Sequence, residues 1–189
     1  MNRKKTGFVI LGIILAGIVL AWLLFFNRGQ TYIPEEQGGI RGDRNQNLEK
    51  VNQFLVEKDE ERIRSFIKRR DWEMEQTGTG LWYQINRDQA GESIDPGDFV
   101  KMNYDIRLLD GTLCYSSDST GAKQFIAGQQ ESIVGLQEGI QKLSEGDKAR
   151  FIIPPHLAYG LIGDEKKIPA RAILVYSVHV LEVQKRSRE

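Results

Sequence analysis

Residues 131–143 read ESIVGLQEGIQKL, and this stretch decides the fold predicted for the rest of the chain. Its apolar residues recur at intervals of three and four, which places them on one face of a short helix. They are Ile133, Leu136, Ile140 and Leu143. Glu131 and Ser132 stand at its start, where their side chains can satisfy free backbone amides. The other strongly patterned stretches after residue 80 read as β-strands, so we predict an α+β fold: a curved antiparallel sheet wrapped over one short helix.

The clearest strand is predicted at residues 99–108, FVKMNYDIRL, where apolar and polar side chains alternate. Asp110 and Gly111 then signal a hairpin that returns through residues 112–116. Further strands are predicted at residues 81–85, 124–127, 148–153 and 172–183. Residues 156–171 form a long loop before the last strand, and a loop of this length inside a compact domain is typical of a functional segment.

The N-terminal part contains an uninterrupted apolar run, FVILGIILAGIVLAWLLFF, at residues 8–26. A helix of this length, at ~1.5 Å per residue, approaches the ~30 Å thickness of a bilayer's hydrocarbon core. Arg3, Lys4 and Lys5 precede it, which favours a cytoplasmic N-terminus with the rest of the chain outside. The run is longer than that of a signal peptide and lacks a small-residue cleavage site, so an uncleaved anchor is favoured over a cleaved signal.

Composition shifts divide the chain into four predicted segments. They are a membrane anchor at 1–27, a flexible glycine-containing tether at 28–46, a helical spacer at 47–75 and a folded domain at 76–189. The spacer has two small apolar stripes, Leu48, Val51, Leu55 and Ile63, Phe66, Ile67. One interpretation is a helix that packs on the following domain. The other is an arm that joins two copies into a homodimer through residues 47–70.

Several function classes are disfavoured by the residues that the chain lacks. Lys and Arg together number 26, as do Asp and Glu, so the basic excess typical of a nucleic-acid binder is absent. With one cysteine and two histidines, the sequence offers no zinc-ligand spacing. It also contains no nucleophile elbow and no glycine-rich phosphate loop, so we expect no cofactor and no metal.

What remains is a set of inward-facing apolar and aromatic residues. They are Tyr104, Phe125, Ile133, Leu136, Tyr159, Ile168 and Tyr176. Patterning alone is equally consistent with an ordinary core. However, Tyr159 lies between Ala158 and Gly160 in the predicted loop, where an aromatic core residue is less expected, and this favours a cavity.

Several short motifs occur in the order found in one enzyme family. They are VKMNY at 100–104, LDGT at 109–112, SS at 116–117, FIAG at 125–128, ESI at 131–133, LQEG at 136–139, GDKAR at 146–150, IPPHLAYG at 153–160 and IPA at 168–170. On these motifs, residues 81–183 resemble an FKBP-type peptidyl-prolyl cis–trans isomerase domain. With its apolar N-terminus, the chain is similar to membrane-bound members from Bacteroidetes, including ones linked to gliding motility.

This resemblance implies an isomerase that assists the folding of periplasmic or envelope proteins. Its partners would be proline-containing polypeptides and, through the N-terminal helix, the inner membrane, with the C-terminal domain in the periplasm. The implied catalytic residues are Tyr104, Phe125, Ile133, Tyr159 and Tyr176. The implied substrate-binding residues are Cys114, Tyr115, Glu131, Ser132, Leu136 and Ile168. In the family's account, the Ile133 amide and the Tyr159 hydroxyl hold the peptide's carbonyl groups, and Phe125, Leu136 and Tyr176 surround the proline ring.

Five positions depart from the family pattern. Cys114 and Tyr115 replace a phenylalanine and an aspartate, Leu136 replaces a tryptophan, Asp164 replaces a histidine, and Tyr176 replaces a phenylalanine. The departures at Cys114, Tyr115 and Leu136 motivate an alternative: a chaperone or adaptor module of the same fold with little catalytic power, acting in a gliding or envelope machinery.

Overall fold

The computed structural model describes residues 37–87, 91–129 and 132–186, with side chains from residue 46 onward. The apolar run at residues 8–26 and the predicted site residue Glu131 lie outside these ranges. Among the helices that the structure describes, none is both long enough and apolar enough to cross a membrane. The chain divides into two compact units, Met1–Lys50 and Val51–Glu189, and the second contains the sheet.

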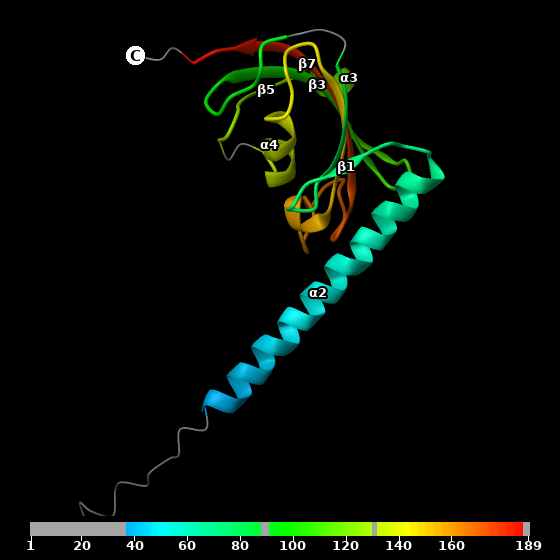
Figure 1. Cartoon of the computed structure of the whole chain (residues 1–189), viewed down its shortest axis with the longest axis vertical. Coiled ribbons are helices and arrows are strands. Elements are labelled where there is room, and N and C mark those ends of the chain that lie inside the picture. Colours follow the sequence, from blue (N-terminus) through cyan, green and yellow to red (C-terminus); the bar gives the residue numbers. More distant parts are fainter. Residues whose placement is uncertain (1–36, 88–90, 130–131, 187–189) are drawn as a thin grey trace, which may run out of the picture. The chain divides into compact units, whose positions relative to one another are not determined.

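The strands of the described residues form one seven-stranded sheet in the order β1-β2-β6-β7-β3-β4, with β5 paired to β3. They are β1 (Glu75–Gln76), β2 (Trp82–Asn86), β3 (Phe99–Leu108), β4 (Leu113–Ser116), β5 (Lys123–Ile126), β6 (Lys148–Ile153) and β7 (Leu174–Gln184). Every pairing is antiparallel. Figure 1 shows the sheet curving around the helix α4 (Val134–Ile140), which confirms the predicted α+β architecture.

The short helix α4 lies close to the sheet because two of its residues have no side chain. A Cβ atom on Gly135 would lie 2.5 Å from Cγ2 of Ile153, and one on Gly139 would lie 2.8 Å from the ring of Phe151. Leu136 and Ile140 are fully buried beside these glycines. The apolar face predicted for this stretch is therefore the packed face.

The limits of α4 differ from the sequence prediction. The helix is shorter than residues 131–143, and its N-cap is Ile133, which makes no side-chain capping hydrogen bond. Ser132 precedes the cap, so its predicted role in satisfying the first amides of the helix is wrong. Leu143, in the turn after the helix, is buried as predicted.

The C-terminal part of a second helix, α2 (Gln37–Arg69), covers the other face of part of the sheet. Its residues Ile63, Phe66 and Ile67 form a cluster with residues of β2, β6 and β7 and of the loop before β7. The members of this helix-side cluster are Ile63, Phe66, Ile67, Trp82, Ile152, Ile173 and Val175. This contact confirms that the second stripe of the predicted spacer packs on the domain. It also explains the continuous apolar run at the end of β6, since that strand is buried on both faces.

The remaining differences concern short elements and the start of α2. The helix begins at Gln37 rather than at Asn47, so part of the predicted tether is helical. Residues 117–123, which lie between two predicted strands, contain the one-turn helix α3 (Ser117–Thr120), whose N-cap Ser116 accepts a hydrogen bond from the Asp118 amide. The loop before β7 begins with the 3-10 helix η1 (Pro155–Leu157).

A charged side chain ties down the C-terminal end of β7, the sheet's longest strand. Nζ of Lys185 lies 2.8 Å from Oδ2 of the buried Asp98 and 2.9 Å from Oδ2 of Asp95. Burial opposes the ionisation of Asp98, but hydrogen bonds from Lys185 and from backbone amides outweigh it and lower its pKa. This contact fixes the end of β7 against the turn that leads into β3.

Candidate functional site

A cavity of about 300 Å³ opens beside β3, β4, β7 and the loop after η1. Aromatic and charged side chains line it: Tyr104, Ile106, Tyr115, Lys123, Tyr159, Asp164, Lys166 and Tyr176. We refer to it as the tyrosine cavity. Concave sites with mostly apolar walls and a few directed polar groups are typical of ligand binding.

Strand register brings three of these side chains together. Ile106 of β3 is paired with Tyr115 of β4 on one side and with Tyr176 of β7 on the other. Directly paired residues of neighbouring strands point to the same face of a sheet. Tyr104, two residues before Ile106, points to that face as well, and its hydroxyl lies 3.1 Å from Oγ1 of Thr120.

Tyr159 comes from the loop and closes the cavity from another direction. Pro154 ends β6, η1 follows, and the amides of Ala158 and Gly160 then both donate to the carbonyl of Pro155. Burial raises the pKa of Tyr159, and the charge of Asp164 raises it further, while a side-chain hydrogen bond with Tyr176 acts in the opposite direction.

Tyr176 and Tyr159 interact through their hydroxyl groups. Burial raises the pKa of Tyr176 well above its usual value, and its hydrogen bond with Tyr159 adds to this. Either phenol can be the donor in such a pair, because each hydroxyl both donates and accepts. When Tyr176 donates, the hydroxyl proton of Tyr159 is free to bind a carbonyl group in the cavity.

Asp164 organises the loop and reaches the cavity wall. Its Oδ1 accepts hydrogen bonds from the amides of Lys166 (3.0 Å), Lys167 (2.9 Å) and Ile168 (2.7 Å), and its Oδ2 accepts one from the hydroxyl of Tyr115. Burial opposes the ionisation of Asp164, but these hydrogen bonds lower its pKa to about 2. The same bond raises the pKa of Tyr115 to about 12. At neutral pH the pair is therefore a phenol that donates to a carboxylate.

Four of the predicted site residues line the tyrosine cavity, and most of the others lie in the core that adjoins it. Tyr104, Tyr115, Tyr159 and Tyr176 line the tyrosine cavity. Cys114, Phe125, Leu136 and Ile168 are instead buried in the adjoining core. Ile133 is half-buried and packs against that core, Ser132 is half-buried beside it, and Glu131 is outside the described residues.

The predicted site set omits four residues that line the cavity: Ile106, Lys123, Asp164 and Lys166. The alternation of β3 already placed Ile106 on the face of Tyr104, so that signal was present. Asp164 was noted only as a departure from the family pattern, because its approach to β4, like that of Lys166, depends on how the loop folds back.

The chemistry available here is binding and polarisation rather than nucleophilic attack. The cavity offers phenol hydroxyls, an aliphatic floor and charged rim residues, and its lining includes no cysteine or histidine. In the part of the chain that the structure describes, no three His, Cys, Asp or Glu side chains gather in a group that could hold a metal ion.

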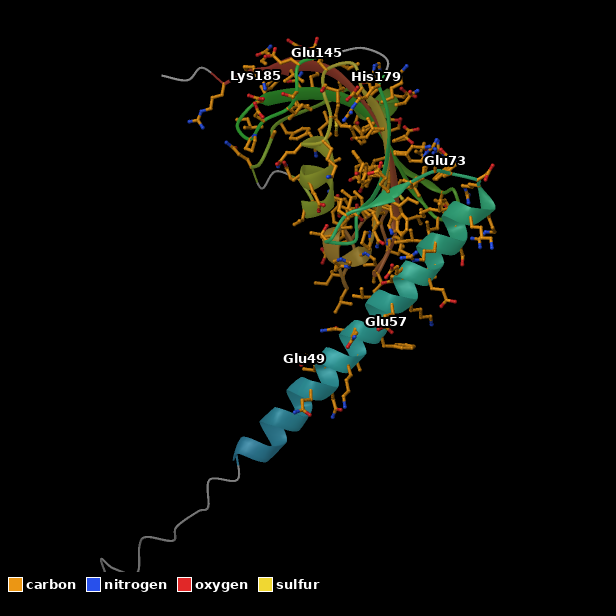
Figure 2. All side chains as sticks on the ribbon, viewed as in Figure 1. Glu49, Glu57, Glu73, Glu145, His179 and Lys185 are labelled. Carbon is orange, nitrogen blue, oxygen red and sulfur yellow. The ribbon has the colours of Figure 1, made fainter. Side chains whose placement is uncertain are left out.

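A larger hollow of about 640 Å³ is a weaker candidate. Most of its lining consists of polar residues of β2, β3, β6 and β7, including His179, which is labelled in Figure 2. Gln84, Arg150, Ser177 and Asp105 form one cross-strand row in it. Such a row is typical of a solvated sheet face, and it lacks the aromatic enclosure of the tyrosine cavity.

Comparison with known proteins assigns the domain that contains this cavity. A family model described as FKBP-type peptidyl-prolyl cis-trans isomerase matches residues 91–181. The human peptidyl-prolyl cis-trans isomerase FKBP10 is 42% identical over 87 residues, which cover 46% of this chain and 15% of that protein. A probable FKBP-type isomerase, FkpA of Neisseria meningitidis, is 34% identical over 113 residues, covering 57% of this chain and 39% of that one.

A solved structure extends the likeness in fold. The crystal structure of FkpA from Escherichia coli matches with a TM-score of 0.58 and 24% identity, covering 97% of each chain. The curated relatives are much longer: this chain spans only 15% of the first of them. The matched region includes β3 to β6, most of β7, α4 and every residue that lines the tyrosine cavity. The chain therefore carries a domain of the FKBP-type peptidyl-prolyl cis-trans isomerase family.

Proposed function

We propose that this chain catalyses cis–trans isomerisation of X-Pro bonds in unfolded proteins outside the cytoplasm, held at the membrane by its N-terminal segment. The observation that carries the proposal is the tyrosine cavity, whose lining includes the hydrogen-bonded phenols of Tyr159 and Tyr176. This arrangement suits a reaction that requires no nucleophile.

The proposed mechanism uses the difference between a planar and a twisted amide. Rotation about the X-Pro bond has a barrier of about 18–20 kcal/mol, because resonance is lost as the amide twists. The twisted amide has less charge separation, so a cavity that excludes water disfavours the planar form more than the transition state. Tyr159 would donate to a peptide carbonyl, while Ile106 and the rings of Tyr104 and Tyr176 enclose the proline.

The test is a proline-isomerisation assay with the full-length chain in detergent micelles. A peptide with one X-Pro bond relaxes on its own in tens of seconds or longer at 25 °C. We expect the rate constant of relaxation to rise in proportion to protein concentration. A rate equal to the uncatalysed one at every protein concentration would exclude the enzyme.

The proposed location rests on the apolar run at residues 8–26 and the cationic residues before it. We propose a single-pass inner-membrane protein with residues after the run in the periplasm, as in the Bacteroidetes proteins that the sequence resembles. An alkaline phosphatase fused after Arg70 should be active in that case. An inactive phosphatase, together with an active cytoplasmic reporter at the same position, would overturn the topology.

The alternative proposal is a chaperone or adaptor of the same fold, in an envelope or gliding machinery. It is favoured by one observation: Phe125 and Leu136, expected around the proline ring, are buried in the core and do not line the cavity. A protein that suppresses aggregation of a proline-free client, but does not accelerate the peptide assay, would support this alternative.

We also retain the proposal that residues 47–70 join two copies. Leu48, Val51 and Phe54 expose most or about half of their side chains to solvent on α2. Sedimentation equilibrium of the full chain in detergent measures this directly. A molar mass of one chain at all concentrations would contradict the dimer.

A further inference from the structure

The turn after Tyr159 exposes two large aliphatic side chains. Leu161 is 67% exposed and Ile162 is 73% exposed, the highest values among the exposed large hydrophobic residues of the described chain. Neither lines the tyrosine cavity. They therefore form a separate apolar surface one residue beyond the cavity wall, and we refer to it as the Leu161–Ile162 lip.

The lip is held in place by its own turn. The amide of Gly163 donates to the carbonyl of Tyr159 (3.2 Å), and the amide of Arg171 donates to the carbonyl of Gly160 (2.9 Å). Gly163 has φ +81°, and a Cβ atom there would lie 2.3 Å from the carbonyl oxygen of Ile168, so only glycine fits. Hydrogen bonds thus close the turn on both sides of Leu161 and Ile162 and keep their side chains outside the core.

Strand β4 fixes the same loop from the opposite side of the cavity. The hydroxyl of Tyr115 donates to Asp164, and Sγ of Cys114 lies 3.5 Å from the carbonyl oxygen of Lys167. Asp164 in turn accepts three amides of the loop. The loop that carries the lip is thus held by hydrogen bonds to β4 and within itself. A ligand would therefore bind the lip without much loss of conformational freedom in the protein.

The surroundings of the lip restrict what can cover it. Glu165, Lys166 and Lys167 follow closely in sequence and are exposed. An apolar pair bordered by charges is far smaller than the roughly 1,200–2,000 Å² that a stable protein–protein interface buries. A small apolar group, delivered by a chain that is already held nearby, fits this surface better than a second folded copy.

We propose that the Leu161–Ile162 lip binds an apolar side chain of an unfolded client, at a residue outside the X-Pro pair held in the tyrosine cavity. This inference rests on the proposed isomerase function and extends it to the substrate class. A polypeptide seated in the cavity leaves across its rim, and only Gly160 separates the lip from Tyr159 on that rim. The preferred clients are therefore prolines in apolar segments, which folded proteins bury.

The lip acts on binding and not on the chemical step. An apolar contact remote from the twisting bond is made equally in the ground state and the transition state, so it lowers KM and leaves kcat unchanged. Burying one aliphatic side chain against two others corresponds to about a tenfold change in affinity.

The experiment uses a set of proline peptides in an alanine background, each with a single leucine placed progressively farther from the X-Pro pair. With the full-length chain, we expect one placement to lower KM about tenfold relative to the all-alanine peptide, at constant kcat. In the double variant L161S/I162S, the leucine peptide should have the same KM as the all-alanine peptide. The all-alanine peptide should keep the kcat and KM that it has with the natural chain. Equal KM values for all leucine placements would overturn the proposal. It would also be overturned if the leucine peptide kept its lower KM in the double variant.

Two controls separate the lip from other causes. Leu181→Ser removes an exposed leucine from β7 and should leave the leucine advantage intact, whereas L161M/I162V should retain it because the surface stays apolar. If no peptide is isomerised, the proposed enzyme function fails, and the lip is then tested by fluorescence titration of the same peptides. The leucine peptide should still bind about tenfold more tightly to the natural chain than to L161S/I162S, and equal affinities would overturn the lip.

Discussion

The tyrosine cavity and the helix-side cluster lie on opposite faces of one sheet and share the strand β7, but they use different chemistry. The helix-side cluster is built from aliphatic and aromatic side chains. Arg70 packs on it, with its guanidinium 3.6 Å from the centre of the Phe66 ring. An ion pair between Arg171 and the buried Asp59 (2.6 Å) ties the loop before β7 to α2. The tyrosine cavity, by contrast, keeps an open volume and ends its aromatic side chains in hydroxyl groups.

The difference shows how neighbouring residues of one strand are divided between stability and function. In β7, Val175 belongs to the helix-side cluster, whereas Tyr176 lines the tyrosine cavity. Consecutive side chains of a strand point to opposite faces, so a change on one face need not disturb the other. We therefore expect substitutions in the cluster to change the free energy of unfolding, and substitutions in the cavity to change kcat/KM.

The largest expected effect is that of Phe66→Ala in the helix-side cluster. Phe66 is 3% exposed and packs edge-on against Trp72, with ring centroids 5.5 Å apart. Truncating a buried phenylalanine typically lowers the free energy of unfolding by about 3–5 kcal/mol, because a cavity is left behind. Urea unfolding should show this loss, while kcat/KM of the folded variant in the proline assay stays within about twofold of the natural chain.

The matched control for this prediction lies on the same helix. Phe54 is 61% exposed, so Phe54→Ala should change the free energy of unfolding by no more than about 0.5 kcal/mol. If the two alanine variants lost equal stability, the packing of the C-terminal part of α2 on the sheet would not be the source of the effect.

A smaller loss is expected from Leu136→Trp, which restores the residue of the family pattern. Leu136 is fully buried in the core and does not line the tyrosine cavity, so an indole has no open space to enter. Overpacking of this kind costs about 1–3 kcal/mol. A lower melting temperature without tighter binding of a proline peptide is expected, whereas Leu136→Met should stay close to the natural chain. Tighter binding by the tryptophan variant would place Leu136 at the cavity floor after all.

The comparison of the two faces also explains how much the sequence could predict. The bounds of β3 were predicted correctly because that strand alternates between a packed face and a solvent face. At the end of β6, Phe151, Ile152 and Ile153 give no alternation, since α2 and α4 bury both sides. There the sequence indicates a buried strand without indicating what covers each face.

Two errors of the sequence prediction, the extent of the tether and the missing Asp164, also have physical causes. Glycines within residues 38–42 suggested a tether, but isolated glycines only weaken a helix by about 1 kcal/mol each, and α2 includes them. In the site, strand periodicity was sufficient to select Tyr104 and Tyr176. It could not place Asp164 beside Tyr115, because the residues are far apart in sequence and meet only when the loop folds over β4.

In the tyrosine cavity, Tyr159→Phe is expected to reduce catalysis without reducing stability. The substitution keeps the ring and removes the hydroxyl that is hydrogen-bonded with Tyr176 and that we propose donates to substrate. A lost hydrogen bond is worth about 0.5–1.5 kcal/mol, so kcat/KM should fall by a few-fold to about tenfold. Tyr83→Phe, which removes from β2 a hydroxyl that donates to Glu75 of β1, is the control and should leave kcat/KM unchanged. Equal rates for the Tyr159 variant and the natural chain would make Tyr159 a packing residue only.

The smallest expected effect is that of breaking the Tyr115–Asp164 contact, which should also depend on pH. Asp164 has a folded-state pKa of about 2, below its ordinary value, so its stabilising effect is fully present above pH 3.8 and is lost as the pH falls towards 2. Tyr115 has a pKa raised to about 12, so its stabilising effect is present below pH 10 and lost as the pH rises through 12.

Asp164→Asn should therefore lower the free energy of unfolding by on the order of 1 kcal/mol. This loss should be constant between pH 5 and 9 and should shrink below pH 3.8. Tyr115→Phe should cause a similar loss, and the double variant should lose less than the sum, because both changes remove one shared bond. Urea unfolding of the three variants across this pH range measures these effects, and fully additive losses would mean that the two side chains act independently.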